Sequence, residues 1–208
     1  MTALRLVLVR HGQTPSNVVN SLDSRPPGPP LTDLGRQQAA AVADALAALP
    51  VVAVYASVAV RAQQTAAPIA AAHGLDVQVV EGVHEAFVGD LECRNDPDAM
   101  AAFFAVFHRW TRSAELDVPM PGGESAQQVL DRFLPVVAGI RSRHEDGVVV
   151  LVSHGAAIRI SSFALSPNVD AELADQHLLH NGGRVVLEAD DSSPTGWRCL
   201  EWAGATVN

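Results

Sequence analysis

Short runs of apolar residues recur along the chain, separated by longer segments in which apolar positions follow helical spacing. An unbroken apolar run of about four to eight residues is typical of a strand buried on both faces, whereas helical spacing is typical of an amphipathic helix. The apolar runs predict strands at residues 4–9, 51–56, 77–80 and 148–152. Residues 184–188 and 197–202 predict two further strands around a turn at 192–194.

The segments between these strands carry signals that begin and end helices. Thr32 is suited to cap a helix that runs to about Leu49, where Pro50 stops it. The inner face of this helix is expected to hold Val42, Ala45, Leu46 and Leu49. Gly74 is placed to end a second helix over residues 59–73. Helical spacing also predicts helices over residues 98–112 and 154–165.

A capping-box pattern at residues 125–128 opens a further helix, because Ser125 is followed three positions later by Gln128. Pro135 lies within this helix and should kink it. Its inner face is expected to consist of Val129, Phe133, Val136, Val137 and Ile140.

Strands that alternate with amphipathic helices favour a mostly parallel sheet covered on both faces. We therefore predict an α/β fold, a three-layer α/β/α sandwich in one domain over residues 1–208. The segment at about 85–123 is expected to form a lid or insertion over the sheet edge. The proline-rich segment 25–30 is expected to be a stiff loop between the first strand and the first helix.

Composition narrows the class of protein. Apolar residues make up 48% and charged residues 18% of the chain, which is ordinary for a folded globular protein. No apolar run is long enough to cross a bilayer, and the run at 4–9 is too short for a signal peptide and is interrupted by Arg5. The two cysteines, Cys93 and Cys199, predict no disulfide framework, so a reducing, cytoplasmic location is expected.

The charge balance argues against broad anionic partners. The formal net charge is −9 and the pI is about 5.2, so neither nucleic acid nor a membrane surface is an expected partner. All 14 cationic side chains are arginines. Lysine Schiff-base chemistry and a Walker-type phosphate loop are thereby excluded. Any anion must be held by a local cluster of positive groups.

Polar residues follow three of the predicted strands, at the edge where open α/β sheets place ligand sites. Residues 10–12 (Arg-His-Gly) follow the first strand, Ser57 and Arg61 follow the second, and residues 153–155 (Ser-His-Gly) follow the strand at 148–152. If these strands are parallel neighbours, two histidines and two arginines converge in one pocket. Such a cluster, with helix N-termini beside it, suits a phosphoryl group.

Phosphoryl transfer also needs a proton for the departing oxygen. Carboxyl groups near the third strand and the start of the lid offer candidates, and spacing alone does not choose among Glu81, Glu85, Asp90 and Glu92. A metal site built from His and Glu is a competing interpretation. No His-Glu-x-x-His or Cys/His ligand spacing is present, so we predict no metal.

The remaining histidines, arginines and aromatic residues have plainer interpretations. The histidines at 73, 84, 108, 144, 177 and 180 are assigned to surface, capping or packing roles. Arg25, Arg94, Arg109 and Arg112 are interpreted as solvated charges, with contact to a substrate carboxylate or second phosphate as the alternative. The helically spaced group Phe103, Phe104, Phe107 and Trp110 is interpreted as lid packing, although a lid that recognises an organic leaving group would use the same residues.

Taken together, the motifs resemble those of the histidine phosphatase superfamily, in its phosphoglycerate-mutase-like branch, over nearly the whole chain. The matching motifs share their order and spacing with that family. They are Arg-His-Gly-x-Thr-x-x-Asn at 10–17, Leu-Thr-x-x-Gly at 31–35, Arg-Ala-x-Gln-Thr-Ala at 61–66, Pro-x-Gly-Glu-Ser at 121–125, Ser-His-Gly at 153–155 and Asn-Gly at 181–182.

The resemblance implies a fold of the phosphoglycerate-mutase type and a set of roles. The implied catalytic residues are His11, Glu85, His154, Arg10 and Arg61. The implied phosphate-binding residues are Arg10, Asn17, Thr14, Arg61, His154 and Gly155. His11 would attack phosphorus and Glu85 would protonate the leaving oxygen, with no metal or cofactor. His11 must be neutral to attack, so its other ring nitrogen should donate to a backbone carbonyl.

The chain departs from the family pattern around Glu85, and the departures bear on substrate choice. Val88 replaces an aromatic residue, Leu91 a tryptophan and Cys93 a glycine. The predicted function is that of a metal-independent phosphatase acting on a small-molecule phosphate monoester through a phosphohistidine. The alternatives are a cofactor-dependent phosphoglycerate mutase and a phospho-ligand-binding protein with little activity. The expected partners are a small phosphorylated substrate and, as an option, a second copy of the chain in a homodimer.

Overall fold

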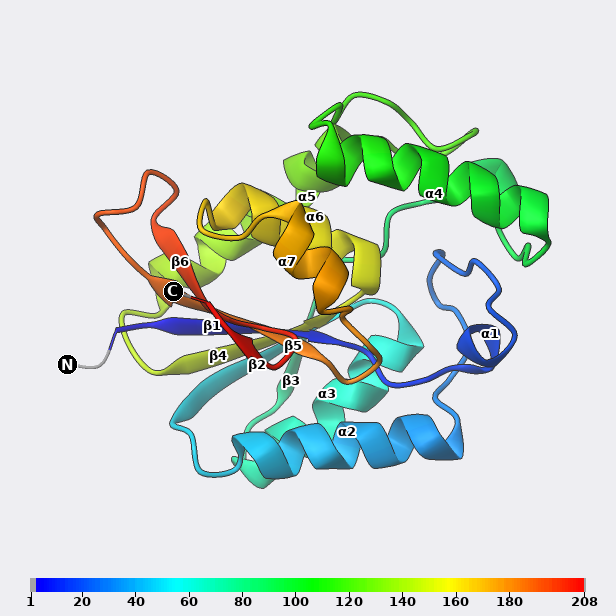
Figure 1. The fold of residues 1–208 in the computed structure, drawn as a ribbon. Coiled ribbons are helices and arrows are strands. Elements are labelled where there is room, and N and C mark those ends of the chain that lie inside the picture. Colours follow the sequence, from blue (N-terminus) through cyan, green and yellow to red (C-terminus); the bar gives the residue numbers. More distant parts are fainter. Residues whose placement is uncertain (1–2, 208) are drawn as a thin grey trace.

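The computed structural model describes residues 3–207, in which seven strands form one sheet (Figure 1). The strands are β1 (Arg5–Arg10), β2 (Val51–Ser57), β3 (Val77–Val80), β4 (Val148–Ser153), β5 (Arg184–Ala189), β6 (Trp197–Trp202) and β7 (Ala205–Thr206). The helices are α1 (Pro15–Val18), α2 (Asp33–Leu46), α3 (Val60–Ala72), the 3-10 helix η1 (Gly89–Leu91), α4 (Pro97–Arg112), α5 (Ala126–Arg143), α6 (Gly155–Leu165) and α7 (Ala171–Gln176). None of these helices is long and apolar enough to span a membrane.

The strand order is β3-β2-β4-β1-β5-β6-β7. The first four strands in this order are parallel, as the alternating pattern predicts. β5, β6 and β7 add antiparallel pairs at one side, so the sheet is mixed and its centre is parallel. In the pairing of β1 with β4, Arg10 lies opposite Ser153. The polar residues that follow these two strands therefore leave the sheet side by side.

Each face of the sheet contributes to a hydrophobic core, because successive side chains of a strand point to opposite faces. Along β4, Val149 and Leu151 join the cluster that includes side chains of α5 and α6. Val148, Val150 and Val152 join the cluster on the other face, against α2 and α3. Figure 1 shows α2 and α3 on one side of the sheet and α5, α6 and α7 on the other. The predicted three-layer α/β/α sandwich is confirmed.

The capping signals place the helices well, with one correction. The Thr32 side chain accepts a hydrogen bond from the Gly35 amide at the start of α2, and the capping box at 125–128 is formed. However, α2 ends at Leu46 instead of about Leu49. Its buried residues, spaced three or four apart, are Gly35, Ala39, Val42, Ala43 and Leu46, while Ala45 and Leu49 are exposed. The helix predicted to begin at the capping box is α5, and it contains Pro135 as expected.

The segment 85–123 carries η1 and α4. Figure 1 shows α4 (green) set apart from the sheet, above the part of the chain that holds α1. The Asp96 side chain accepts a hydrogen bond from the Ala99 amide and so caps the start of α4. The aromatic residues Phe107 and Trp110 of α4 are buried in the core cluster that also contains α5 and α6. This side of α4 anchors the segment to the body of the protein.

Candidate active site

His11 lies directly after β1 and is 5% exposed. Its Nδ1–H donates to the Gly12 carbonyl oxygen at 2.7 Å, so the ring carries its free lone pair on Nε2. This is the backbone hydrogen bond that the sequence predicted for a neutral, attacking imidazole. Burial, followed by the charges of Arg61 and Arg10, lowers the pKa of His11 well below its usual value. The ring is therefore neutral at neutral pH.

His154 lies beside His11, with the two ring centroids 5.1 Å apart. It is fully buried at the N-cap position of α6. Its Nε2 lies 2.9 Å from the Ser57 hydroxyl, and its Nδ1 has no hydrogen-bond partner within residues 3–207. Burial is the main reason that the pKa of His154 is well below its usual value. Ser57, at the end of β2, thus holds the second histidine in place.

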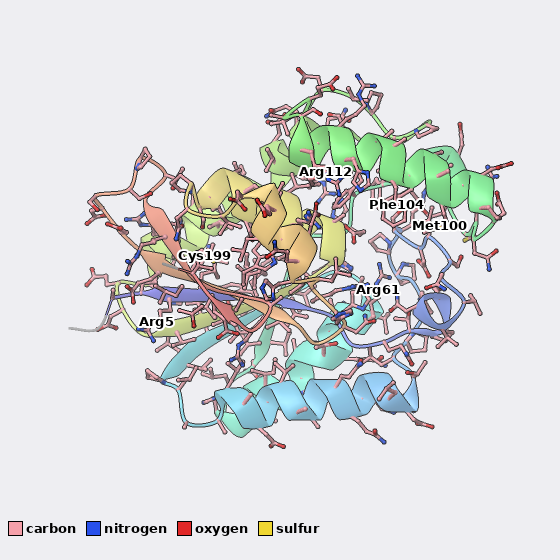
Figure 2. All side chains as sticks on the ribbon, viewed as in Figure 1. Arg5, Arg61, Met100, Phe104, Arg112 and Cys199 are labelled. Carbon is pink, nitrogen blue, oxygen red and sulfur yellow. The ribbon has the colours of Figure 1, made fainter. Side chains whose placement is uncertain are left out.

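Two arginines approach the same centre. Arg61, labelled in Figure 2, is 2% exposed and donates from Nε to His11 Nε2 at 3.3 Å. Arg10 donates to the Leu179 carbonyl oxygen at 2.7 Å. In the described part of the chain, Arg10 Nε and Arg61 Nη1 are buried without a hydrogen-bond partner. Buried donors of this kind are suited to the oxygens of a tetrahedral anion.

Gly155 allows Arg10 to lie against the start of α6. A Cβ at position 155 would come within 3.3 Å of Arg10 Nε, closer than side chains usually pack.

The proline-rich loop 25–30 lies against Arg61 in a similar way. The Pro27 carbonyl accepts a hydrogen bond from Val60 at the start of α3. Gly28, with φ +65°, leaves space where a Cβ would lie 2.1 Å from Arg61 Nη1. The loop therefore positions an arginine of the site, a role that the sequence did not reveal.

A cavity of about 480 Å³ opens in front of His11. Predicted site residues that line it are Arg10, His11, Asn17, Glu85 and Gly155. Arg61 and His154 contact His11 but are not on the cavity wall. Thr14 is also absent from the wall. Its hydroxyl and its amide both donate to Asn17 Oδ1, at 3.1 and 3.0 Å, so Thr14 orients Asn17 instead of facing the cavity as predicted.

Asn181 completes this side of the site. Its side-chain amide donates to Asn17 Oδ1 at 3.1 Å and to the His11 carbonyl oxygen at 3.0 Å. With its oxygen engaged by Thr14 and Asn181, Asn17 keeps its NH₂ group as the donor available to an anion. The Asn-Gly turn at 181–182 thus orients residues of the first loop.

The structure distinguishes among the four candidate carboxyl groups. Glu85 lines the cavity, and its two oxygens accept from the Ala86 and Ala157 amides at 2.9 Å and from the Ala156 amide at 3.2 Å. The last two amides belong to the first turn of α6, next to His154. Glu92 instead accepts hydrogen bonds from the Ser24 amide and hydroxyl. Glu81 and Asp90 are exposed and do not line the cavity.

Arg132 and Glu124 hold the loop that carries Glu85, and neither was predicted to do so. Arg132 donates to the carbonyl oxygens of Gly82, His84 and Glu85 at 2.8–2.9 Å. It also forms a half-buried ion pair with Glu124 at 2.8 Å, and Glu124 accepts from the Phe87 amide. Glu124 belongs to the recognised motif at 121–125, whereas Arg132 stands in no motif.

Two further features of the structure concern Cys93 and possible metal ligands. Cys93 has φ +61°, in the left-handed region that favours glycine, which agrees with the glycine that the family pattern has at this position. Across residues 3–207, no group of three or more His, Cys, Asp or Glu side chains is arranged to hold a metal ion. Positive charge at the site comes from the two arginines, and the Glu85 carboxyl group lines the same cavity as His11.

Comparison with known proteins gives a consistent result. The model of the histidine phosphatase superfamily (branch 1) matches residues 6–203. The PE-PGRS family protein PE_PGRS11 of Mycobacterium tuberculosis is 34% identical over 221 residues, which cover 96% of this chain and 36% of that protein. The metal-independent phosphoserine phosphatase of Arabidopsis thaliana is 33% identical over 74% of this chain and 65% of its own length. The chain thus spans about a third of the length of the mycobacterial relative and about two thirds of the length of the Arabidopsis relative.

Among solved structures, mycobacterial glucosyl-3-phosphoglycerate phosphatase in complex with VO₃ superposes with a TM-score of 0.83 at 30% identity. The match covers 97% of this chain and 99% of that one. The similarity therefore extends over the sheet, both helical layers and the segment that carries α4.

Proposed function

The chain belongs to the histidine phosphatase superfamily, branch 1, and on that premise we propose that it is a metal-independent phosphatase that hydrolyses a small-molecule phosphate monoester through a phosphohistidine on His11. The observation that carries the proposal is the state of the His11 ring. Its Nδ1 donates to a backbone carbonyl, so the lone pair of the ring is on Nε2, where it accepts a hydrogen bond from Arg61 Nε at 3.3 Å. The two relatives described above whose names state an activity are phosphatases.

In the first step, His11 Nε2 attacks phosphorus and the bond from phosphorus to the alcohol oxygen breaks. Arg10 and Arg61 bind the phosphoryl oxygens through Arg10 Nε and Arg61 Nη1, which make no hydrogen bond in the described chain; Arg61 Nη1 also lies 3.9 Å from Asp23 Oδ1. Glu85, on the cavity wall, gives a proton to the departing oxygen. The products are the free alcohol and a phosphohistidine.

In the second step, a water molecule attacks the phosphohistidine. The Glu85 carboxylate, which the first step has left ionised, accepts a proton from this water. The bond between phosphorus and Nε2 breaks, and inorganic phosphate leaves. The arginines supply the positive charge that a metal ion supplies in many other phosphoryl-transfer sites. Asn17 and Gly155, on the same wall, complete the phosphate site.

A panel of phosphate monoesters, assayed for phosphate release in the presence of EDTA, tests the proposal. Wild-type protein is expected to release phosphate from at least one ester with no loss of rate in EDTA. His11→Ala is expected to release none. His73→Ala, a histidine outside the cavity, is the matched control and should retain full activity. Activity lost on chelation and restored by zinc, or activity retained by His11→Ala, would refute the scheme.

The mutase alternative demands a site that retains a bisphosphate. Within residues 3–207 the cavity wall carries two arginines, Arg10 and Arg159, and the second is already ion-paired with Asp175. A bisphosphate would bring two strongly negative groups to this wall, which has little positive charge to retain them. The site therefore favours hydrolysis over transfer of the phosphoryl group. Incubation with 3-phosphoglycerate and a trace of 2,3-bisphosphoglycerate separates the two. Isomer formation that outpaces phosphate release would reverse this order.

The third alternative, a binding protein with little activity, is distinguished by the same panel. It requires measurable binding of phosphate esters with no phosphate release.

We also propose that residues 1–208 act as one domain with 85–123 as its lid, and that the protein works in the cytoplasm. The two cysteines, one exposed and one buried and neither in a disulfide, support that location. A homodimer stays a prediction.

A further inference from the structure

The cavity has a polar end and an apolar side. The polar end is formed by the residues that surround His11. The apolar side is formed largely by α4, which presents Met100, Phe103, Phe104 and Phe107 to the cavity. Figure 2 shows Met100 and Phe104 on the underside of α4, the side toward Arg61. The α4 side chains therefore meet the part of a substrate that projects away from the phosphoryl group.

Other apolar residues complete this surface from three separate segments. Leu22 and Val88 line the cavity from the loops that follow α1 and precede η1, and Leu178 lines it from the loop after α7. Phe104 is 45% exposed and Leu178 is 56% exposed, so both present uncovered apolar surface to the same space. Two large apolar side chains that remain exposed where they line one cavity favour an apolar occupant.

Among the described residues, Arg159 is the arginine on this side of the cavity, and it is ion-paired. Arg159 of α6 is 8% exposed and forms an ion pair with Asp175 of α7. Asp175 is also paired with Arg112, at 2.8 Å. The Arg159 guanidinium carbon lies over the rings of Phe107 and Phe163, at 5.5 and 5.6 Å from their centroids.

A carboxylate on the substrate would have to displace Asp175, or enter between the aromatic rings, to reach the Arg159 guanidinium. Arg159 Nε is buried and has no hydrogen-bond partner in the described structure. The ion pair and the two rings restrict the approach of a second anion to this side of the cavity.

We infer that the apolar surface formed by α4, Leu22, Val88 and Leu178 is the binding site for the leaving alcohol, and that the preferred substrates are phosphate monoesters of apolar alcohols with a ring or a branched chain. This inference rests on the proposed phosphatase function. It assigns to Val88 and to the α4 aromatic residues a role in substrate choice. A cavity of about 480 Å³ has the volume for an alcohol of this size.

The test compares esters whose alcohols are all aliphatic, so that leaving-group chemistry does not decide the result. We expect kcat/KM for 2-phenylethyl phosphate to exceed that for glycerol phosphate, phosphoserine and 3-phosphoglycerate by about tenfold or more. The reason is that burial of its aromatic ring in the cavity favours binding. Higher kcat/KM for phosphoserine or 3-phosphoglycerate would overturn the inference while leaving the phosphatase proposal intact.

Variants locate the preference. Phe104→Ala and Leu178→Ala should each lower the ratio of kcat/KM between 2-phenylethyl phosphate and glycerol phosphate several-fold. The matched control is Leu34→Ala, because Leu34 is 48% exposed and lies outside the cavity. This control should leave the ratio unchanged. An unchanged ratio in both cavity variants would refute the assignment.

A binding measurement keeps this inference separate from the phosphatase proposal. Calorimetry with 2-phenylethylphosphonate, which is not hydrolysed, should show weaker binding to Phe104→Ala than to wild type and to Leu34→Ala. If no ester is hydrolysed but this difference is present, the phosphatase proposal fails and the apolar subsite stands. Equal binding by all three proteins would contradict the subsite.

Discussion

At the scale of single residues, the site depends on two buried imidazoles that the fold keeps neutral. Burial lowers the pKa of both His11 and His154 well below the usual value, and the arginine charges lower it further. A neutral His11 has the lone pair that attack on phosphorus requires. The same burial has a consequence for stability, because an unfolded chain protonates these rings near their usual pKa.

The free energy of unfolding should depend on pH in a defined direction. Each of these histidines binds more protons in the unfolded state below about pH 6.5, so stability is greatest above that pH and declines as the pH falls. The decline should reach at most about 1.4 kcal/mol per pH unit for each histidine. Urea unfolding at pH 7.5, 6.5 and 5.5 in phosphate-free buffer measures it. His154→Gln should show a shallower decline than wild type, and an identical slope would contradict the account.

Glu85 makes a second prediction at this scale. Glu85→Gln keeps the side chain's shape but removes the proton it gives to the leaving oxygen. For alkyl phosphates kcat/KM should fall by about 10²–10⁴, the range typical of general acid catalysis. For p-nitrophenyl phosphate, whose leaving group needs no proton, the first step should be far less affected. A loss that is equal for both esters would exclude Glu85 as the acid. Glu81→Gln, at an exposed position, is the control.

At the scale of elements, the loop at 82–87 depends on one arginine of α5. Arg132→Ala removes hydrogen bonds to the carbonyl oxygens of Gly82, His84 and Glu85, and the ion pair with Glu124. We expect it to lower stability by about 1–3 kcal/mol, because half-buried carbonyl groups lose their donor. It should also lower kcat/KM for alkyl phosphates more than for p-nitrophenyl phosphate, since Glu85 is displaced.

Two observations separate this positioning role from a general loss of structure. Arg109→Ala removes an arginine from the exposed ion pair with Glu115 and should change neither stability nor the ratio between the two esters. Arg132→Lys keeps the charge but not the planar set of donors, so it should restore the ratio only in part. A lower rate in Arg132→Ala that is the same for both esters would show that the acid loop is not its target.

Several elements could be predicted from the sequence because their signals are local. The apolar run of β4 and the caps at Thr32 and Ser125 each depend on a few neighbouring residues. The short elements α1, α7 and β7 have too few residues to show a period. Leu49 was placed on the inner face by spacing alone, but α2 ends before it.

The site residues could also be predicted where their signals are local. His11, His154 and the two arginines could be predicted because they follow strands or open helices at recognisable motifs. Glu85 required either a family pattern or the structure, because its selection depends on the amides at the start of α6. Arg132 and the contact of Gly28 with Arg61 join residues far apart in the sequence, and no local pattern reports such contacts.

At the scale of the whole molecule, the sheet order explains how separate segments of the chain form one site. β1 and β4 are parallel neighbours, and β2 lies beside β4, so the residues after all three strands emerge at the same edge. The chain carries a net charge of −9, yet Arg10 and Arg61 converge at this edge. Anion binding is therefore a property of this cluster and not of the protein's overall charge.

Direct detection of a phosphoryl group on His11 tests this account most plainly. Glu85→Gln is mixed rapidly with p-nitrophenyl phosphate, quenched in alkali and mapped by mass spectrometry. Because this variant forms the phosphohistidine but lacks the base that activates water, the peptide that contains His11 should carry the phosphoryl group. The same peptide in His11→Ala should carry none. Phosphate release from wild type with the phosphoryl group on another side chain, or on none, would contradict the account.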